Sequence, residues 1–86
     1  MSSKYIFIKI YRGVDLRMLT VRLKIDKTLE KLKISRYELA KRTGIRYQII
    51  DNYYKNKVVR YDNYVLSRMC EALSCDISDI LELTEI

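Results

Sequence analysis

The sequence predicts one compact all-α domain of five short helices, preceded by an N-terminal β-strand or hairpin. Apolar residues recur at helical spacing from Ile25 onward, and capping and stop residues divide that stretch into short segments. The first residues instead alternate with the two-residue period of a strand. A chain of 86 residues can bury one hydrophobic core but not two. We therefore expect an extension over residues 1–22 and a helical domain over residues 23–86.

The extension begins with a strong strand signal. Over residues 5–11 every position except Lys9 is β-branched or aromatic, and the three isoleucines share one face. Residues 12–15 can turn, and residues 16–23 alternate again, which predicts a hairpin. Because an isolated hairpin is only marginally stable, its apolar face would need the helical body or a partner chain to cover it.

The middle of the chain predicts two helices joined at a glycine. Ser35 and Glu38 fit a capping box, in which each side chain accepts the backbone N–H of the other residue. The helix that follows spans about residues 36–43 and ends at Gly44, which adopts the left-handed conformation without steric cost. A further helix is expected over about residues 47–55. Its predicted inward contacts are Ala40, Ile45, Ile50 and Tyr53.

Three flanking helices complete the predicted body. The first spans about residues 25–33, because apolar residues recur at i, i+4 and i+7 at Ile25, Leu29 and Leu32. Asp62 can cap the fourth helix, whose core stripe is predicted to be Leu66, Met69, Cys70 and Leu73. A short fifth helix is expected over about residues 77–83, packing Ile77, Ile80 and Leu81 against the body.

The charge is unevenly distributed along the chain. Residues 1–60 carry 16 Lys/Arg against 5 Asp/Glu, whereas residues 61–86 carry one arginine against six acidic residues. A basic body with an acidic tail indicates a polyanionic partner, nucleic acid before an anionic membrane surface. The early apolar run is short and interrupted by Lys9, so it predicts neither a signal peptide nor a membrane span. We expect a cytoplasmic protein.

The residues needed for most catalytic or metal chemistry are missing. The sequence has no histidine, and its two glycines make no phosphate-binding loop. Cys70 and Cys75, five positions apart, have neither a zinc spacing nor a disulfide framework, so we expect both to be reduced and Cys70 to lie in the core. The sequence therefore predicts no enzyme activity, no cofactor, no metal and no small-molecule substrate.

The apolar and turn residues of the middle segment resemble those of the Cro/C1-type (XRE-like) helix-turn-helix family. The resemblance rests on Leu39-Ala40, Thr43-Gly44-Ile45, Ile50 and Tyr53, and extends over residues 23–81. It implies a lambda-repressor-like five-helix domain that binds double-stranded DNA. Asn56 stands where the family commonly has glycine. Family members often begin near Met18, so residues 1–17 are an embellishment or an upstream extension from a wrongly chosen start codon.

The second helix of the pair would present its polar face to the major groove. A helix that reads DNA in this way contacts base edges from its N-terminal turns. Arginine can fork to guanine, and glutamine or asparagine to adenine. A carboxylate in this setting accepts from a cytosine amino group, or pairs with Arg46 or Lys55 to orient them. The predicted base-reading residues are Arg46, Tyr47, Gln48, Asp51, Asn52 and Lys55.

Phosphate contacts are implied by the resemblance at both ends of this helix. They would fix the position of the protein on the duplex without reading its sequence. Carried over from the family, they are Arg36, Tyr37, Lys57, Arg60 and Tyr61.

The leading hypothesis is a sequence-specific transcriptional regulator that binds DNA as a homodimer, with repression as the favoured role, although the sequence does not determine the direction of regulation. Residues 5–11 are the predicted dimer contact, through edge pairing with a second copy. An antitoxin-like module that binds a partner protein as well as DNA is one alternative, because eight tyrosines and an acidic tail suit a protein interface. A basic module that binds RNA or any nucleic acid is another.

Overall fold

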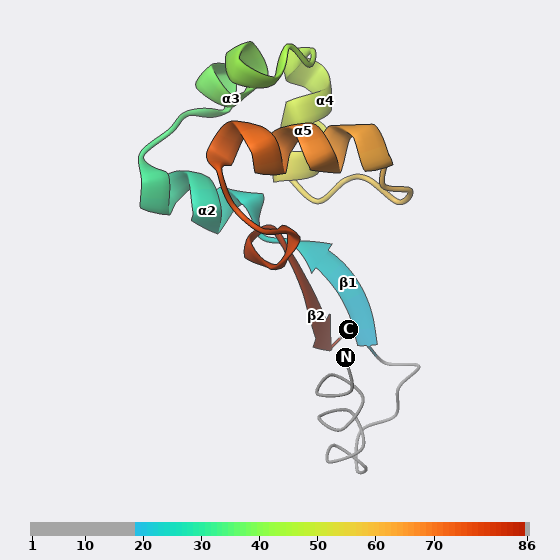
Figure 1. Ribbon diagram of the computed structural model, residues 1–86. Helices are drawn as coiled ribbons and strands as arrows, with labels where there is room; N and C mark the ends of the chain where they lie inside the picture. Colours follow the sequence, from blue (N-terminus) through green and yellow to red (C-terminus); the bar gives the residue numbers. More distant parts are fainter. Residues whose placement is uncertain (1–18, 86) are drawn as a thin grey trace.

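The computed structural model describes residues 19–85, and this part of the chain forms a mostly helical fold with a two-stranded sheet. Helices α3, α4 and α5 gather at one end, and the sheet projects from the other (Figure 1). The predicted strand over residues 5–11 lies outside the described residues. No helix between residues 19 and 85 is long and apolar enough to cross a membrane. The elements in order are β1 (Leu19–Leu23), α2 (Ile25–Leu32), α3 (Arg36–Thr43), α4 (Tyr47–Tyr54), α5 (Asn63–Leu73), the 3₁₀ turn η2 (Ile77–Asp79) and β2 (Leu81–Glu85).

The prediction of a fifth α-helix over residues 77–83 is wrong, because this segment forms η2 followed by β2. Asp76 and Asp79 each accept the backbone N–H of the other in a capping box around the 3₁₀ turn. Residues 81–85 then alternate apolar and polar side chains, which suits a strand once a partner is available. β1 is that partner, antiparallel to β2 with Leu23 opposite Leu81. The fold therefore has four α-helices in its described part and is not all-α.

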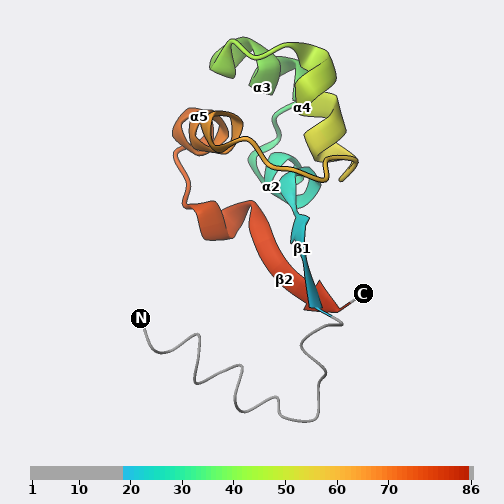
Figure 2. The same ribbon diagram turned by 90° about the vertical axis from the view of Figure 1, so that its right-hand side faces the viewer.

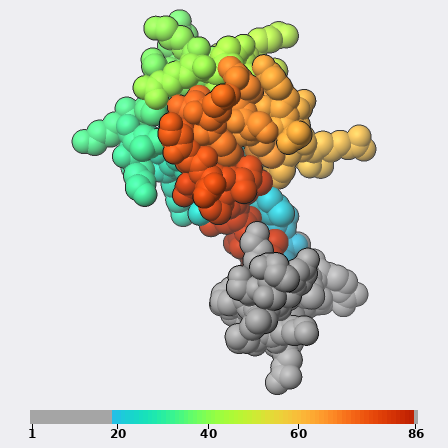
Figure 3. Space-filling view, viewed as in Figure 1, coloured from blue at the N-terminus to red at the C-terminus, as the bar shows by residue number. Residues whose placement is uncertain are grey.

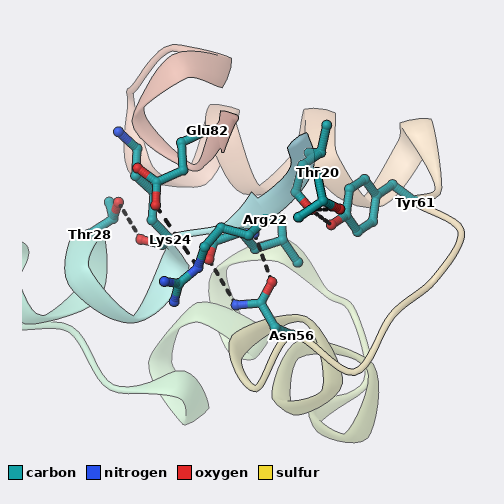
Figure 4. A network of polar contacts seen from close by, with 9 residues as sticks. Thr20, Arg22, Lys24, Thr28, Asn56, Tyr61 and Glu82 are labelled. Atoms are coloured by element: carbon teal, nitrogen blue, oxygen red, sulfur yellow. Dashed lines mark hydrogen bonds and ion pairs between the residues drawn. The ribbon is translucent and has the colours of Figure 1, made fainter. Parts of the chain in front are cut away.

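Asn56 anchors β1 to the helical body. The Leu23 N–H donates to Asn56 Oδ1 at 2.8 Å, and Asn56 Nδ2 donates to the Leu23 carbonyl at 2.8 Å (Figure 4). The backbone of Asn56 has φ 58°, the left-handed conformation that glycine adopts most freely. The boundary expected after residue 22 thus falls within β1, which pairs with the C-terminal strand and is bound to the loop after α4.

A single hydrophobic core joins the helices to the base of the sheet. The expected inward residues Ala40, Ile45, Ile50 and Tyr53 are all buried. Leu32, predicted to face inward from the first helix, is instead 42% exposed because α2 ends there. The most deeply buried large side chains are Leu23, Ile25, Leu39, Ile50, Met69 and Ile80.

The core stripe of α5 is rotated from its predicted position. Val65, Met69 and Leu73 are buried at i, i+4 and i+8, whereas the predicted Leu66 and Cys70 are only half-buried at its edge. Cys70 therefore does not lie in the fully buried core.

The start of α3 agrees with the sequence in one half of its expected cap. Ser35 Oγ accepts the Glu38 N–H at 3.0 Å, and α3 begins at the next residue, as predicted. The reciprocal bond from the Ser35 N–H to the Glu38 side chain is not formed; the Glu38 carboxylate accepts from Arg42 Nε at 3.0 Å. Asp62 caps α5 as predicted, accepting from the Tyr64 N–H at 2.8 Å.

Candidate nucleic-acid interface

A left-handed glycine turns the chain between α3 and α4, at the end of the molecule away from the sheet (Figures 1 and 2). Gly44 has φ 73°, and its N–H donates to the Ala40 carbonyl at 2.9 Å. The buried Thr43 hydroxyl donates to the Leu39 carbonyl at 2.9 Å and accepts the Ile45 N–H at 3.1 Å. These buried bonds fix the turn, so the orientation of α4 relative to α3 does not depend on a bound ligand.

The inward face of α4 is held by Ile50, which is fully buried, and Tyr53, which is 4% exposed. The Tyr53 hydroxyl also accepts the Asp62 N–H at 2.8 Å, and this ties the loop after α4 to the helix. Ile49, at 37% exposed, lies at the edge of the core. With one face held in this way, α4 has a defined opposite face available for a ligand.

Four of the six predicted base-reading residues are exposed on or beside α4: Arg46, Tyr47, Gln48 and Lys55. Asn52 is half-buried, and its Oδ1 accepts from Gln48 Nε2 at 3.1 Å. The two amides thus form one polar pair, which retains the Gln48 oxygen as an acceptor and the Asn52 nitrogen as a donor. Side chains of α3 and α4 project from this end of the molecule (Figure 3).

The first turn of α4 is open to an anionic ligand. No side chain caps it, so its leading backbone N–H groups keep their hydrogen-bonding capacity. Beside it, Tyr37 at the start of α3 is 72% exposed, and its ring centroid lies 6.5 Å from that of Tyr47. Two tyrosine rings, one from each helix, therefore lie near each other at the start of α4.

Asp51 does not lie on the outward face of α4, contrary to the sequence-based prediction. It is 8% exposed, because Arg36 Nη1 contacts Oδ1 at 2.6 Å and Lys55 Nζ contacts Oδ2 at 3.1 Å. Lys55 was an expected partner, whereas Arg46 is not a partner and Arg36 was not foreseen. The Lys55 ammonium and then the Arg36 guanidinium hold the pKa of Asp51 below its ordinary value, against the opposing effect of partial burial. Asp51 therefore stays ionised at neutral pH. Through Arg36 and Lys55 it links the start of α3 to the end of α4.

Tyr54 completes this cluster, and sequence reasoning missed it. The Arg36 guanidinium carbon lies 4.4 Å from the Tyr54 ring centroid, so the guanidinium is held between an aromatic face and a carboxylate. The sequence pattern that could have predicted this cluster is the i, i+3, i+4 spacing of Asp51, Tyr54 and Lys55. That spacing places the three side chains on one side of α4.

The remaining predicted phosphate contacts lie on the loop that follows α4. Lys57 and Arg60 are exposed there. Tyr61 is half-buried, with its hydroxyl 3.4 Å from the Val21 carbonyl and its ring 6.2 Å from that of Tyr53. Tyr61 therefore packs against β1 and the core. The structure brings Arg36 and Tyr37 to α4 itself, and leaves this loop at the opposite end of the helix.

The charges of the described residues separate along the molecule. Residues 36–60 carry seven Lys/Arg against two Asp/Glu, and both acidic side chains are paired with cations. Residues 76–85, in η2 and β2, carry four acidic residues and no basic one. Residues 36–60, which include α3 and α4, therefore carry an excess of positive charge that suits a polyanion.

Comparison with known proteins agrees with this geometry. A family model described as a Cro/C1-type HTH DNA-binding domain matches residues 24–85. A solved structure named as transcriptional regulator VanUg superposes with a TM-score of 0.65 at 26% identity, over 79% of this chain and 89% of that one. A Bacteroides fragilis protein named for DNA binding gives a TM-score of 0.65 at 19% identity, over 73% of this chain and 100% of that one. No curated protein sequence matched the chain.

Proposed function

The chain belongs to the Cro/C1-type helix-turn-helix DNA-binding family, and on that premise we propose that it is a sequence-specific, non-enzymatic regulator of transcription. In this proposal α4 enters the major groove of double-stranded DNA. The 26% identical structural relative is named as a transcriptional regulator, which supports the same role here.

The observation that carries the proposal is the arrangement of α4. Its inner face is locked by Ile50 and Tyr53, its first turn has no side-chain cap, and its outer face presents the paired amides of Gln48 and Asn52. A rigid helix with free N-terminal amides and bidentate side chains is what base-edge readout requires.

Separate roles follow for the surrounding residues. Arg46, Tyr47, Gln48, Asn52 and Lys55 are proposed to contact base edges, and Arg36, Tyr37, Lys57 and Arg60 to contact phosphates. We assign Asp51 a positioning role, because both of its oxygens are already bound by Arg36 and Lys55. Tyr61 is proposed as a phosphate contact only through its exposed edge.

The DNA-binding unit is proposed to be residues 23–86 together with the paired strand β1, and to act as a homodimeric repressor. One helix of this kind contacts only a few base pairs, so two copies on half-sites about 34 Å apart are the usual solution. The edge pairing predicted for residues 5–11 remains a prediction. Light scattering on the full chain and on a chain that begins at Met18 tests it. Equal dimerisation of the two would contradict the role of residues 5–11.

The proposed function is tested by fluorescence anisotropy on duplexes. A preferred sequence is first selected from randomised DNA, then compared with its scrambled version at several salt concentrations. We expect a specificity ratio of at least about 10³ at physiological salt. Equal affinity for both duplexes at every salt concentration would refute sequence-specific binding and leave only charge-driven association.

A further inference from the structure

The C-terminus of α5 ends in a Schellman motif that brings two cysteines together. Ser74 has φ 51°, its N–H donates to the Glu71 carbonyl at 3.3 Å, and the Cys75 N–H donates to the Cys70 carbonyl at 3.0 Å. This pair of bonds defines the motif, which ordinarily places the side chains at its two outer positions in contact. Here those positions are Cys70 and Cys75, where an apolar pair is usual.

The two thiols are adjacent and reachable from solvent. Cys70 and Cys75 are both half-buried free cysteines. They line an open surface pocket of about 480 Å³, with the acidic residues Glu71, Asp76 and Asp79 around them. The DNA-binding role uses neither thiol, because the pocket lies at the end of α5 and the start of η2.

Their surroundings make both thiols weak acids. Burial raises the pKa of Cys70, and it raises the pKa of Cys75 to about 11, with the Asp76 and Asp79 carboxylates acting in the same direction. The neighbouring Cys75 thiol opposes this rise in the pKa of Cys70. The pair therefore rests as a dithiol at neutral pH, and its reactivity rises with pH.

We propose that Cys70 and Cys75 are a modification site, which a small cationic disulfide converts into an intramolecular disulfide. The Cys70 thiolate attacks one sulfur of the reagent, forms a mixed disulfide and releases one thiol. The Cys75 thiolate then attacks the Cys70 sulfur and releases the second thiol. Overall the protein loses two electrons and two protons, and the reagent's disulfide is reduced to two thiols.

The preference for a cation follows from the pocket. Three carboxylates lie around the thiols, and within residues 19–85 an ion pair is formed by Glu71, with Arg68 Nη1 at 2.7 Å, and by neither Asp76 nor Asp79. A doubly positive reagent is drawn into this field, whereas an anionic disulfide such as oxidised glutathione is repelled. The difference between the reaction rates of the cationic and the anionic disulfide must shrink as added salt screens the charge of the pocket carboxylates.

The test compares cystamine with oxidised glutathione on the native chain of residues 1–86. Intact mass after acid quenching and alkylation counts the remaining thiols. We expect cystamine to react several-fold faster at low salt, giving a monomer that has lost two hydrogens and has no free thiol. Cys70→Ser and Cys75→Ser should each stop at one stable mixed disulfide. Glu71→Gln removes one pocket carboxylate and should therefore lower the ratio of the cystamine rate to the oxidised glutathione rate.

Three results would overturn the proposal. The first is a wild-type chain that accumulates the mixed disulfide or a cross-linked dimer. The second is equal or faster reaction with oxidised glutathione at low salt. The third concerns the equilibrium with a dithiol buffer. If the Schellman geometry favours closure, the disulfide must be harder to reduce in the folded chain than in urea, and the reverse order would show that the folded contact does not fit the bond.

Discussion

Replacing Asn56 with alanine removes the side chain that joins β1 to the loop after α4, and we expect a large loss of stability. Two hydrogen bonds of 2.8 Å are lost, each worth about 1 kcal/mol in net terms. Leu23 is 0% exposed whereas Asn56 is exposed, so removing the amide opens the two Leu23 backbone groups to water only in part, and the left-handed backbone adds strain for alanine. Together these effects predict a loss of about 2–4 kcal/mol for Asn56→Ala, a considerable part of the 5–15 kcal/mol typical of a small domain.

A second substitution separates the hydrogen bonds from the backbone conformation. Asn56→Gly loses the same two bonds but adopts φ 58° freely, so it should be about 1 kcal/mol more stable than Asn56→Ala. The assay is urea unfolding of the full chain, followed by circular dichroism. Asn63→Ala, an exposed position at the start of α5, is the matched control and should change stability by less than about 0.5 kcal/mol. If Asn56→Ala were no less stable than this control, the amide would not be holding β1.

The remaining predictions concern the DNA-binding end. Gln48→Ala should relax preference at one or two base positions, at about 1–3 kcal/mol of discrimination each, as read by selection from randomised duplexes; unchanged preference would exclude base contact. Arg36→Ala should weaken all duplexes alike and reduce the slope of log K against log salt by about 0.9, and a selective loss would point to base reading instead. Because the folded pKa of Asp51 is lowered from 3.8, its stabilising effect is present above that pH and lost as pH falls through the lower folded value. The stability difference between wild type and Asp51→Asn should therefore shrink below pH 3.8, and a constant difference at low pH would contradict the ion pairs.

The helix-turn-helix was predictable because its signals are local. Ser35 fixes the start of α3, Gly44 fixes its end, and both act through backbone bonds within a few residues. The inward positions of α4 followed from helical periodicity, which Ile50 and Tyr53 obey. For such segments the sequence determines the structure without reference to the rest of the chain.

Features that depend on distant partners were not predictable in the same way. The apolar residues within residues 77–83 fit the spacing of a helix as well as that of a strand. Pairing with β1, which is far away in the sequence, selects the strand. Asp51 occupies a polar position on α4, and only the approach of Arg36 across the turn draws it inward. Asn56 was noted in the sequence as standing where the resembling family commonly has glycine, but its bonds to Leu23 depend on where β1 lies.

The pairing of Leu19 with Glu85 brings the two ends of the described chain side by side in one sheet. A two-residue turn could therefore join β2 to β1, with new ends opened at Val59, which is 94% exposed. In the natural order, this sheet closes the longest loop of the described chain, a slow step in folding. In the circular permutant it would become a local hairpin. The same fold would then be reached by a different sequence of events, with the sheet forming early instead of after the helices have assembled.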